Sequence, residues 1–174
     1  MSANEAKDLI LETSLQCYFF DLLHELNQKN SRPLPREAIF YSSLVMDKFG
    51  SAGEFFEKRE GRVSEKILGI KLMESTHMPK NLRKRELKDI GDTALFICGF
   101  FSDSLNKKLV DVKYYQEIGQ AAYSKLNNLV PSFYDVDSFY YDFSKKFSNV
   151  TLLMDLLAKD ISANRKDERI LWIA

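Results

Sequence analysis

The sequence predicts an all-α fold, a single-domain bundle of six or seven helices over residues 1–174. Apolar residues recur at intervals of three and four along most of the chain, which is the spacing of one helix face. Prolines, glycines and short polar stretches separate these segments. No segment shows the alternation with hairpin turns that is typical of β-strands. A chain of this length can bury a core without disulfides and favours one domain.

The first half of the chain contains three expected helices. The first, residues 4–28, has one apolar face and ends at a proline-rich stretch. The second, residues 35–49, begins with Pro35, because proline suits the first turn of a helix. Residues 50–63 are rich in charge and glycine and are expected to form a loop or irregular insertion. A third helix is expected over residues 64–76.

The second half contains four more expected helices. Asp111 and Asn149 are suitable N-caps for two of them. An apolar C-terminal tail, residues 170–174, is expected to fold back or to meet another chain. The four helices are expected at residues 80–105, 111–128, 136–147 and 149–162.

Charge and hydropathy exclude several broad classes. The chain has 25 basic and 25 acidic residues, so net charge gives no general attraction to nucleic acid or anionic lipid. The longest apolar run, residues 94–101, is far shorter than the roughly 20 residues of a membrane-spanning helix. No signal peptide is visible at the N-terminus. Cys17 and Cys98 lie in apolar helical surroundings and are expected to be buried free thiols, so a cytoplasmic protein is expected.

The stretch GDTALFICGFF, residues 91–101, places two glycines inside an expected helix. Each costs about 1 kcal/mol relative to alanine, so Gly91 and Gly99 need a reason. We expect close packing against the small residues around Gly119, because a short link makes these two helices neighbours. The alternative is that Gly99 leaves space for a ligand.

Asp92 is the polar residue of this stretch, and three roles are open for it. If it is buried, it needs a partner, and Tyr114, Tyr115 and Tyr123 are candidates to donate a hydrogen bond. A structural polar clamp is the leading interpretation, and a solvent-facing residue is the second. The third is a small-molecule site or an unrecognised active site between the helices at 80–105 and 111–128. That pocket would use Asp92, Tyr115, Tyr123 and Gly99.

Residues 90–126 follow the pattern GDxxLFxxGFF, then SLxxKLVDVxYYxxxGxxAYxxL. This segment resembles a family of small uncharacterised helical bacterial proteins, and it covers about a fifth of the chain. The opening helix, with CYFFDLLHEL, also looks like that family's aromatic first helix. The resemblance implies a helical fold and a bacterial cytosolic setting. It brings no activity and no catalytic residues.

Motifs of metal, nucleotide and nucleophilic chemistry are missing from the sequence. The two histidines, His24 and His77, are far apart, and no HExxH, CxxC, P-loop, GxGxxG or GxSxG motif occurs. No metal and no cofactor is therefore expected, and a non-catalytic role is favoured over an enzyme. A basic stretch at residues 80–88 offers Arg83, Lys84 and Arg85 as an anion-binding candidate. A solvated helix face is the more ordinary explanation.

Residues 130–147 carry more aromatic side chains than one helix face can bury. Phe139, Phe143 and Phe147 are expected in the core, with Tyr134 and Tyr141 partly exposed. Exposed aromatics favour protein interfaces, because they bury much area at low entropic cost. The leading expectation is thus a non-catalytic interaction or regulatory module with an unknown protein partner, or with a second copy as a homodimer. The expected partner-binding residues are Phe133, Tyr134, Tyr140, Tyr141 and Trp172.

Overall fold

The computed structural model describes residues 15–50, 62–105 and 112–173, and the side chains of 62–67, 104–105 and 165–173 are not described. The all-α class is confirmed. Six helices have at least 13 residues, and two short helices, a 3₁₀ turn and a small hairpin complete the described part. The elements are α2 (Leu15–Gln28), α3 (Arg36–Gly50), α5 (Arg62–Glu74), η1 (Ser75–His77), α6 (Lys80–Phe100), α7 (Ser102–Leu105), α8 (Val112–Asn127), β1 (Ser132–Phe133), β2 (Val136–Asp137), α9 (Phe139–Lys145) and α10 (Phe147–Ile173).

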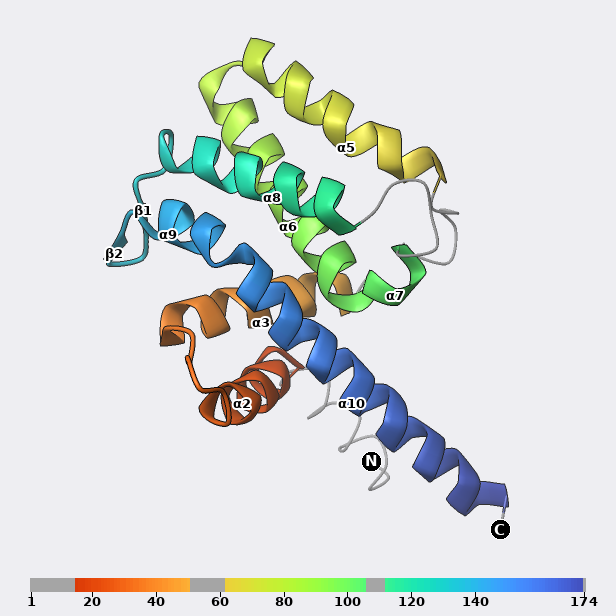
Figure 1. Ribbon diagram of the computed structural model, residues 1–174. Helices are drawn as coiled ribbons and strands as arrows, with labels where there is room; N and C mark the ends of the chain where they lie inside the picture. Colours follow the sequence, from red (N-terminus) through yellow and green to blue (C-terminus); the bar gives the residue numbers. More distant parts are fainter. Residues whose placement is uncertain (1–14, 51–61, 106–111, 174) are drawn as a thin grey trace, which may run out of the picture.

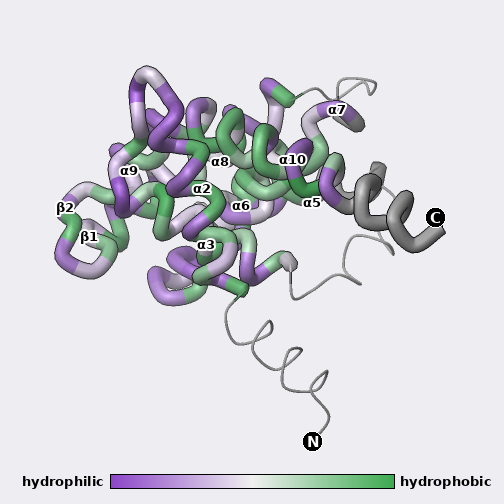
Figure 2. Tube along the Cα trace, turned by 90° about the horizontal axis from the view of Figure 1, so that it is seen from below, coloured by the Kyte–Doolittle hydropathy of each residue, from purple (hydrophilic) through white to green (hydrophobic). Residues whose placement is uncertain are grey.

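Helix α6 is the central element of the bundle (Figure 1). Its most extensive contacts are with α8 and then with α10, while α2 and α3 pack on each other. Helix α10 crosses the molecule diagonally, and the β1–β2 hairpin lies at one edge beside α9. Hydrophobic residues gather where α6, α8 and α10 meet (Figure 2).

The helices differ from the sequence expectation at four places. The expected helix 136–147 begins only at Phe139, because Val136–Asp137 form strand β2. The expected helix 80–105 breaks at Phe101, whose φ of −120° and ψ of 20° leave helical geometry. The last helix begins at Phe147, so Asn149 lies inside it and is not its N-cap. That helix also continues through the expected tail to Ile173. The expected helical residues 4–14, most of the loop 50–63, and the N-cap Asp111 fall outside the described residues.

The hairpin contradicts the expectation that no strand is present. Ser132 pairs with Asp137 and Phe133 with Val136, in antiparallel register. Two residues per strand are too few to produce a readable alternation, and the turn lacks the glycine or asparagine that usually marks a hairpin. The backbone N–H of Ser138 donates to the Pro131 carbonyl at 2.7 Å and closes the base of the hairpin.

The α2–α3 connection is fixed by one side chain. Asn27 is buried, and its Nδ2 donates to the Leu34 carbonyl at 2.9 Å while its Oδ1 accepts from the Leu34 N–H at 2.8 Å. These two bonds satisfy the backbone N–H and carbonyl of Leu34, which lies between Pro33 and Pro35, where regular structure cannot form. It therefore sets the position of α3 relative to α2.

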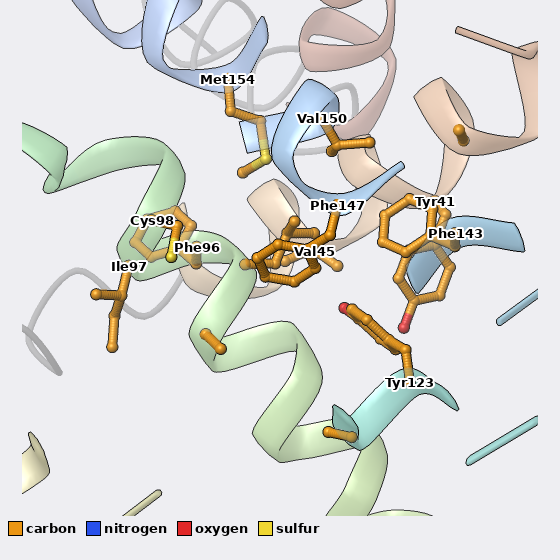
Figure 3. Close-up of a cluster of buried hydrophobic side chains, with 14 of the residues drawn as sticks. Tyr41, Val45, Phe96, Ile97, Cys98, Tyr123, Phe143, Phe147, Val150 and Met154 are labelled. Atoms are coloured by element: carbon orange, nitrogen blue, oxygen red, sulfur yellow. The ribbon is translucent and has the colours of Figure 1, made fainter. Parts of the chain in front are cut away.

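The glycines of the core make room for side chains from neighbouring helices. A methyl group at Gly91 would lie 2.7 Å from the Tyr123 ring, and one at Gly99 would lie 2.8 Å from the Met154 Cβ. At Gly119 it would overlap the Phe147 ring and lie 3.1 Å from the Ala94 Cβ. The close-up in Figure 3 shows Phe147 and Met154 of α10 reaching toward α6. Gly91 and Gly99 thus receive a tyrosine ring and a methionine instead of the small residues around Gly119, which is a correction, whereas Gly119 itself lies close to Ala94 of α6 as expected for neighbouring helices.

Gly119→Ala should destabilise the fold by about 1–3 kcal/mol, because the added methyl group has to displace a buried aromatic ring. Urea unfolding followed by circular dichroism measures the change. Gly50→Ala is the matched control, since a methyl group there would first meet the Phe19 ring at 3.4 Å, an ordinary contact. Equal stability of the two variants would contradict the packing role of Gly119.

Candidate functional site

Asp92 lies at the centre of a buried polar cluster that joins three helices. Its carboxylate is 0% exposed. Oδ1 accepts hydrogen bonds from the hydroxyls of Tyr41 on α3, at 2.5 Å, and Tyr123 on α8, at 2.8 Å. Figure 3 shows the Tyr41 and Tyr123 hydroxyls close to each other beside α6. The cluster accordingly ties α3 and α8 to α6 by a single acceptor atom.

The second carboxylate oxygen of Asp92 faces two lysines. Lys88 Nζ donates to Oδ2 at 2.7 Å, and Lys48 Nζ lies 3.5 Å from the same atom. Both lysines are partly exposed, and Lys48 also pairs with Asp89 at 3.2 Å. Because both oxygens are hydrogen-bonded and positive charge stands next to them, the carboxylate meets the conditions for stable burial.

The phenols around Asp92 are held in their neutral form. Burial, together with the Asp92 charge, raises the pKa of Tyr41 and of Tyr123 well above the ordinary value. Burial also raises the pKa of Tyr140 to about 12, with the Asp92 charge acting in the same direction. These tyrosines donate hydrogen bonds or pack as rings and are poorly suited to accept protons in a reaction near neutral pH.

The residues proposed for a pocket between α6 and α8 are packed instead of open. Tyr115 and Tyr123 are both buried, and Met154 fills the space in front of Gly99. The alternative that Gly99 leaves room for a ligand is therefore wrong, and Gly99 serves packing, although against Met154. Of the predicted donors to Asp92, Tyr123 is confirmed, whereas the second donor, Tyr41, comes from a distant helix that the sequence pattern does not indicate.

Tyr41 connects the polar cluster to the surface. Its ring contacts Phe133 edge-on, with centroids 5.2 Å apart and an interplanar angle of 85°. Phe133 in turn lies 4.7 Å from the Tyr134 ring. The buried carboxylate thus fixes a tyrosine against which the hairpin residue Phe133 is seated.

Phe133 and Tyr134 form part of a groove, hereafter the hairpin groove, with a volume of about 490 Å³. It lies between α2, α3 and the β1–β2 hairpin. Its apolar wall consists of Phe20, Phe40, Phe133, Tyr134 and Val136. Its polar lining consists of Gln16, Cys17, Asp21, Arg36 and Glu37. The volume falls within the range of sites that hold a small ligand or a few side chains.

Tyr134 is the most unusual residue of the groove. Its side chain is 74% exposed, and its φ of 50° lies in the left-handed region. A bulky residue rarely adopts this conformation, which costs of order 1–3 kcal/mol. The Tyr134 ring lies 6.2 Å from Phe40, edge to face, so the strained backbone holds an aromatic ring at the groove rim.

The other expected partner-binding residues have different environments. Tyr140 is buried against Tyr41 and Tyr123, so it belongs to the core and offers no binding surface. Tyr141 is 45% exposed, with Lys145 Nζ 5.0 Å from its ring centroid, and it does not line the groove. The Trp172 side chain lies outside the described residues. Phe139, Phe143 and Phe147 are buried, as predicted.

The basic stretch of α6 divides into separate roles. Arg83 donates to the backbone carbonyls of Ser75, Thr76 and Met78 at 2.8–3.0 Å, so it fixes the η1 turn and is not free for an anion. Lys84 is partly buried. Arg85 lines a shallow second pocket of about 370 Å³ with Lys48, Glu86, Lys88 and Asp89. Of the three predicted anion ligands, Arg85 is the one that lines this pocket.

The two cysteines differ in exposure. Cys98 is buried, and burial raises the pKa of its thiol to about 12. Cys17 is exposed on the lining of the hairpin groove, which contradicts the expectation that it is buried. Both thiols are free. No cluster of three or more metal-ligating side chains occurs within the described part of the chain.

Comparison of the chain with protein-family models, curated proteins and solved structures finds no match. The resemblance of residues 90–126 to a bacterial family therefore stays a prediction. Along the described chain, none of the helices combines the length and the hydropathy that a bilayer crossing needs.

Asp92→Ala should cost about 3–5 kcal/mol of unfolding free energy, because two buried hydroxyls lose their acceptor and two lysines lose a counter-charge. Asp89→Ala is the control, since the ion pairs of Asp89 with described residues are exposed and its loss should cost below about 1 kcal/mol. Chemical denaturation of both variants makes the comparison. Similar losses would show that the cluster does not stabilise the fold.

Stability should fall as pH rises above about 10. Below that pH the three tyrosines are protonated in both states and contribute no pH dependence. Above it the unfolded chain releases their protons while the folded chain retains them, so each tyrosine lowers stability by roughly 1.4 kcal/mol per pH unit. For Tyr140 the effect extends to about pH 12. Urea unfolding at several alkaline pH values tests this expectation. Tyr123→Phe should make the fall of stability with pH less steep, and an unchanged slope would refute the assignment.

Proposed function

We propose that the protein is a non-catalytic interaction module of the bacterial cytoplasm that binds a short segment of a partner protein in the hairpin groove. The observation that carries the proposal is Tyr134, an exposed aromatic ring held at the groove rim in a strained backbone conformation. Such strain persists where the surrounding structure enforces it and is concentrated at functional sites.

The wall of the groove supports binding of side chains. Phe40 contacts both Phe133 and Tyr134, at centroid distances of 6.3 and 6.2 Å, so three rings from two elements form one apolar surface. Aromatic anchors of this kind dominate the energetics of protein interfaces. The β1–β2 hairpin and α9 are adjacent in the chain, and the buried Phe139 packs 4.7 Å from Phe133. The aromatic surface thus rests on the core.

The alternative of a ligand site or a reaction at Asp92 has less support. Both oxygens of the carboxylate are engaged, and the neighbouring glycines are filled by side chains. A reacting group would first have to displace hydrogen bonds that hold three helices together.

Tyr134→Gly should abolish partner binding without loss of stability. Glycine adopts positive φ without strain, so the free energy of unfolding should stay the same or rise by up to about 1 kcal/mol. Tyr141→Ala is the control, because Tyr141 is exposed but lies outside the groove.

The readout is the rate at which iodoacetamide alkylates Cys17, measured with and without the proteins of a source-cell extract that bind the wild-type chain. These proteins are called the partner fraction. Cys17 is exposed in the groove, whereas the buried Cys98 should react slowly because little of it is thiolate. The partner fraction should protect Cys17 in the wild-type protein and in Tyr141→Ala but not in Tyr134→Gly. Protection of all three proteins, or of none, would reject the groove as the binding site.

A further inference from the structure

The charged lining of the hairpin groove is the basis of a more specific inference. Asp21 follows the groove residue Phe20 on α2, and Glu37 lies in the first turn of α3. In the described part of the chain neither carboxylate forms an ion pair within 4.0 Å. Two acidic groups from two helices therefore border the apolar wall, and neither is paired with a cation of the described residues.

Arg36, the one basic side chain of the described lining, is already engaged with the wall. The Arg36 guanidinium lies 5.8 Å from the centroid of the Phe20 ring, on which His24 stacks from the same helix at 5.8 Å. One basic and two acidic side chains give the described lining a net charge of 1 − 2 = −1. This balance favours a bound group that brings positive charge, since complementary potentials set the specificity of an interface.

We propose that the hairpin groove recognises a short peptide segment in which an apolar or aromatic anchor lies close in sequence to Lys or Arg. The anchor packs on Phe40 and Tyr134, and the basic side chain reaches Asp21 or Glu37. This inference rests on the proposed function, and it adds the chemistry of the partner segment.

The sequence of this chain makes its own N-terminal segment a poor occupant. Residues 1–14 contain Glu5, Asp8 and Glu12 against one basic residue, Lys7, which gives a charge of 1 − 3 = −2 without the terminal amine. An acidic segment is repelled by an acidic groove. A basic segment of another protein satisfies both the apolar wall and the charges.

Selection of a random-peptide library displayed on phage tests the inference with the full chain as bait. Peptides that bind the wild-type protein but not Tyr134→Ala are sequenced. We expect Lys or Arg to be enriched within about two positions of an aromatic or aliphatic residue. Enrichment of neutral or acidic peptides that still require Tyr134 would overturn this inference and leave the proposed function standing. Absence of any Tyr134-dependent peptide would overturn both.

The affinity of one enriched peptide then measures the role of the carboxylates. Asp21→Asn and Glu37→Gln should each weaken binding about two- to fivefold, as for exposed ion pairs, and the loss should shrink at high salt. Glu117→Gln on α8 is the control, because Glu117 is exposed and lies outside the groove. Unchanged affinity in both groove variants would overturn the inference even if the variant Tyr134→Ala abolishes binding.

Two other occupants are distinguishable by the alkylation of Cys17 in the protein alone. Protection that grows with protein concentration, together with dimers in light scattering, would identify a second copy as the occupant. Protection in a dilute monomer would identify a segment of the same chain. Either result would overturn the peptide proposal, whereas rapid alkylation at all concentrations supports an empty groove ready for a partner.

Discussion

The hydrogen bonds to one carboxylate oxygen are the constraint on which this fold depends. Asp92 Oδ1 accepts from Tyr41 and Tyr123, so α3, α6 and α8 meet at a single atom. A buried carboxylate is tolerated only when its hydrogen bonds and charge are satisfied, and here the two phenols and Lys88 meet that condition together. The same requirement fixes the position of each ring, because a small shift of either helix would leave a polar group unpaired.

The shape of the hairpin groove depends on that cluster. Tyr41 uses its hydroxyl in the cluster and its ring against Phe133, and Phe133 supports Tyr134 at the surface. A preorganised wall loses less entropy on binding than a mobile one. The interior carboxylate and the exposed aromatic ring are therefore successive parts of one packed chain of contacts.

Local patterns in the sequence predict the long helices and only part of the site. The burial of Asp92 and its bond to Tyr123 follow from two neighbouring helices joined by a short link. Tyr41 could not be found in this way, because 51 residues separate it from Asp92 and no local pattern marks the contact. The groove cannot be predicted for the same reason, since α2, α3 and the hairpin form it jointly. Turn positions with positive φ favour Gly, Asn or Asp, so the sequence does not predict that Tyr134 adopts this conformation.

The Asn27 connection to Leu34 has a consequence for the entropic cost of folding. It joins residues 7 positions apart, whereas the Tyr41–Asp92 bond joins residues 51 positions apart. The entropic cost of closing the shorter loop is lower by about 2 kcal/mol. The α2–α3 connection can consequently close at a lower entropic cost than the contact that brings Tyr41 to Asp92.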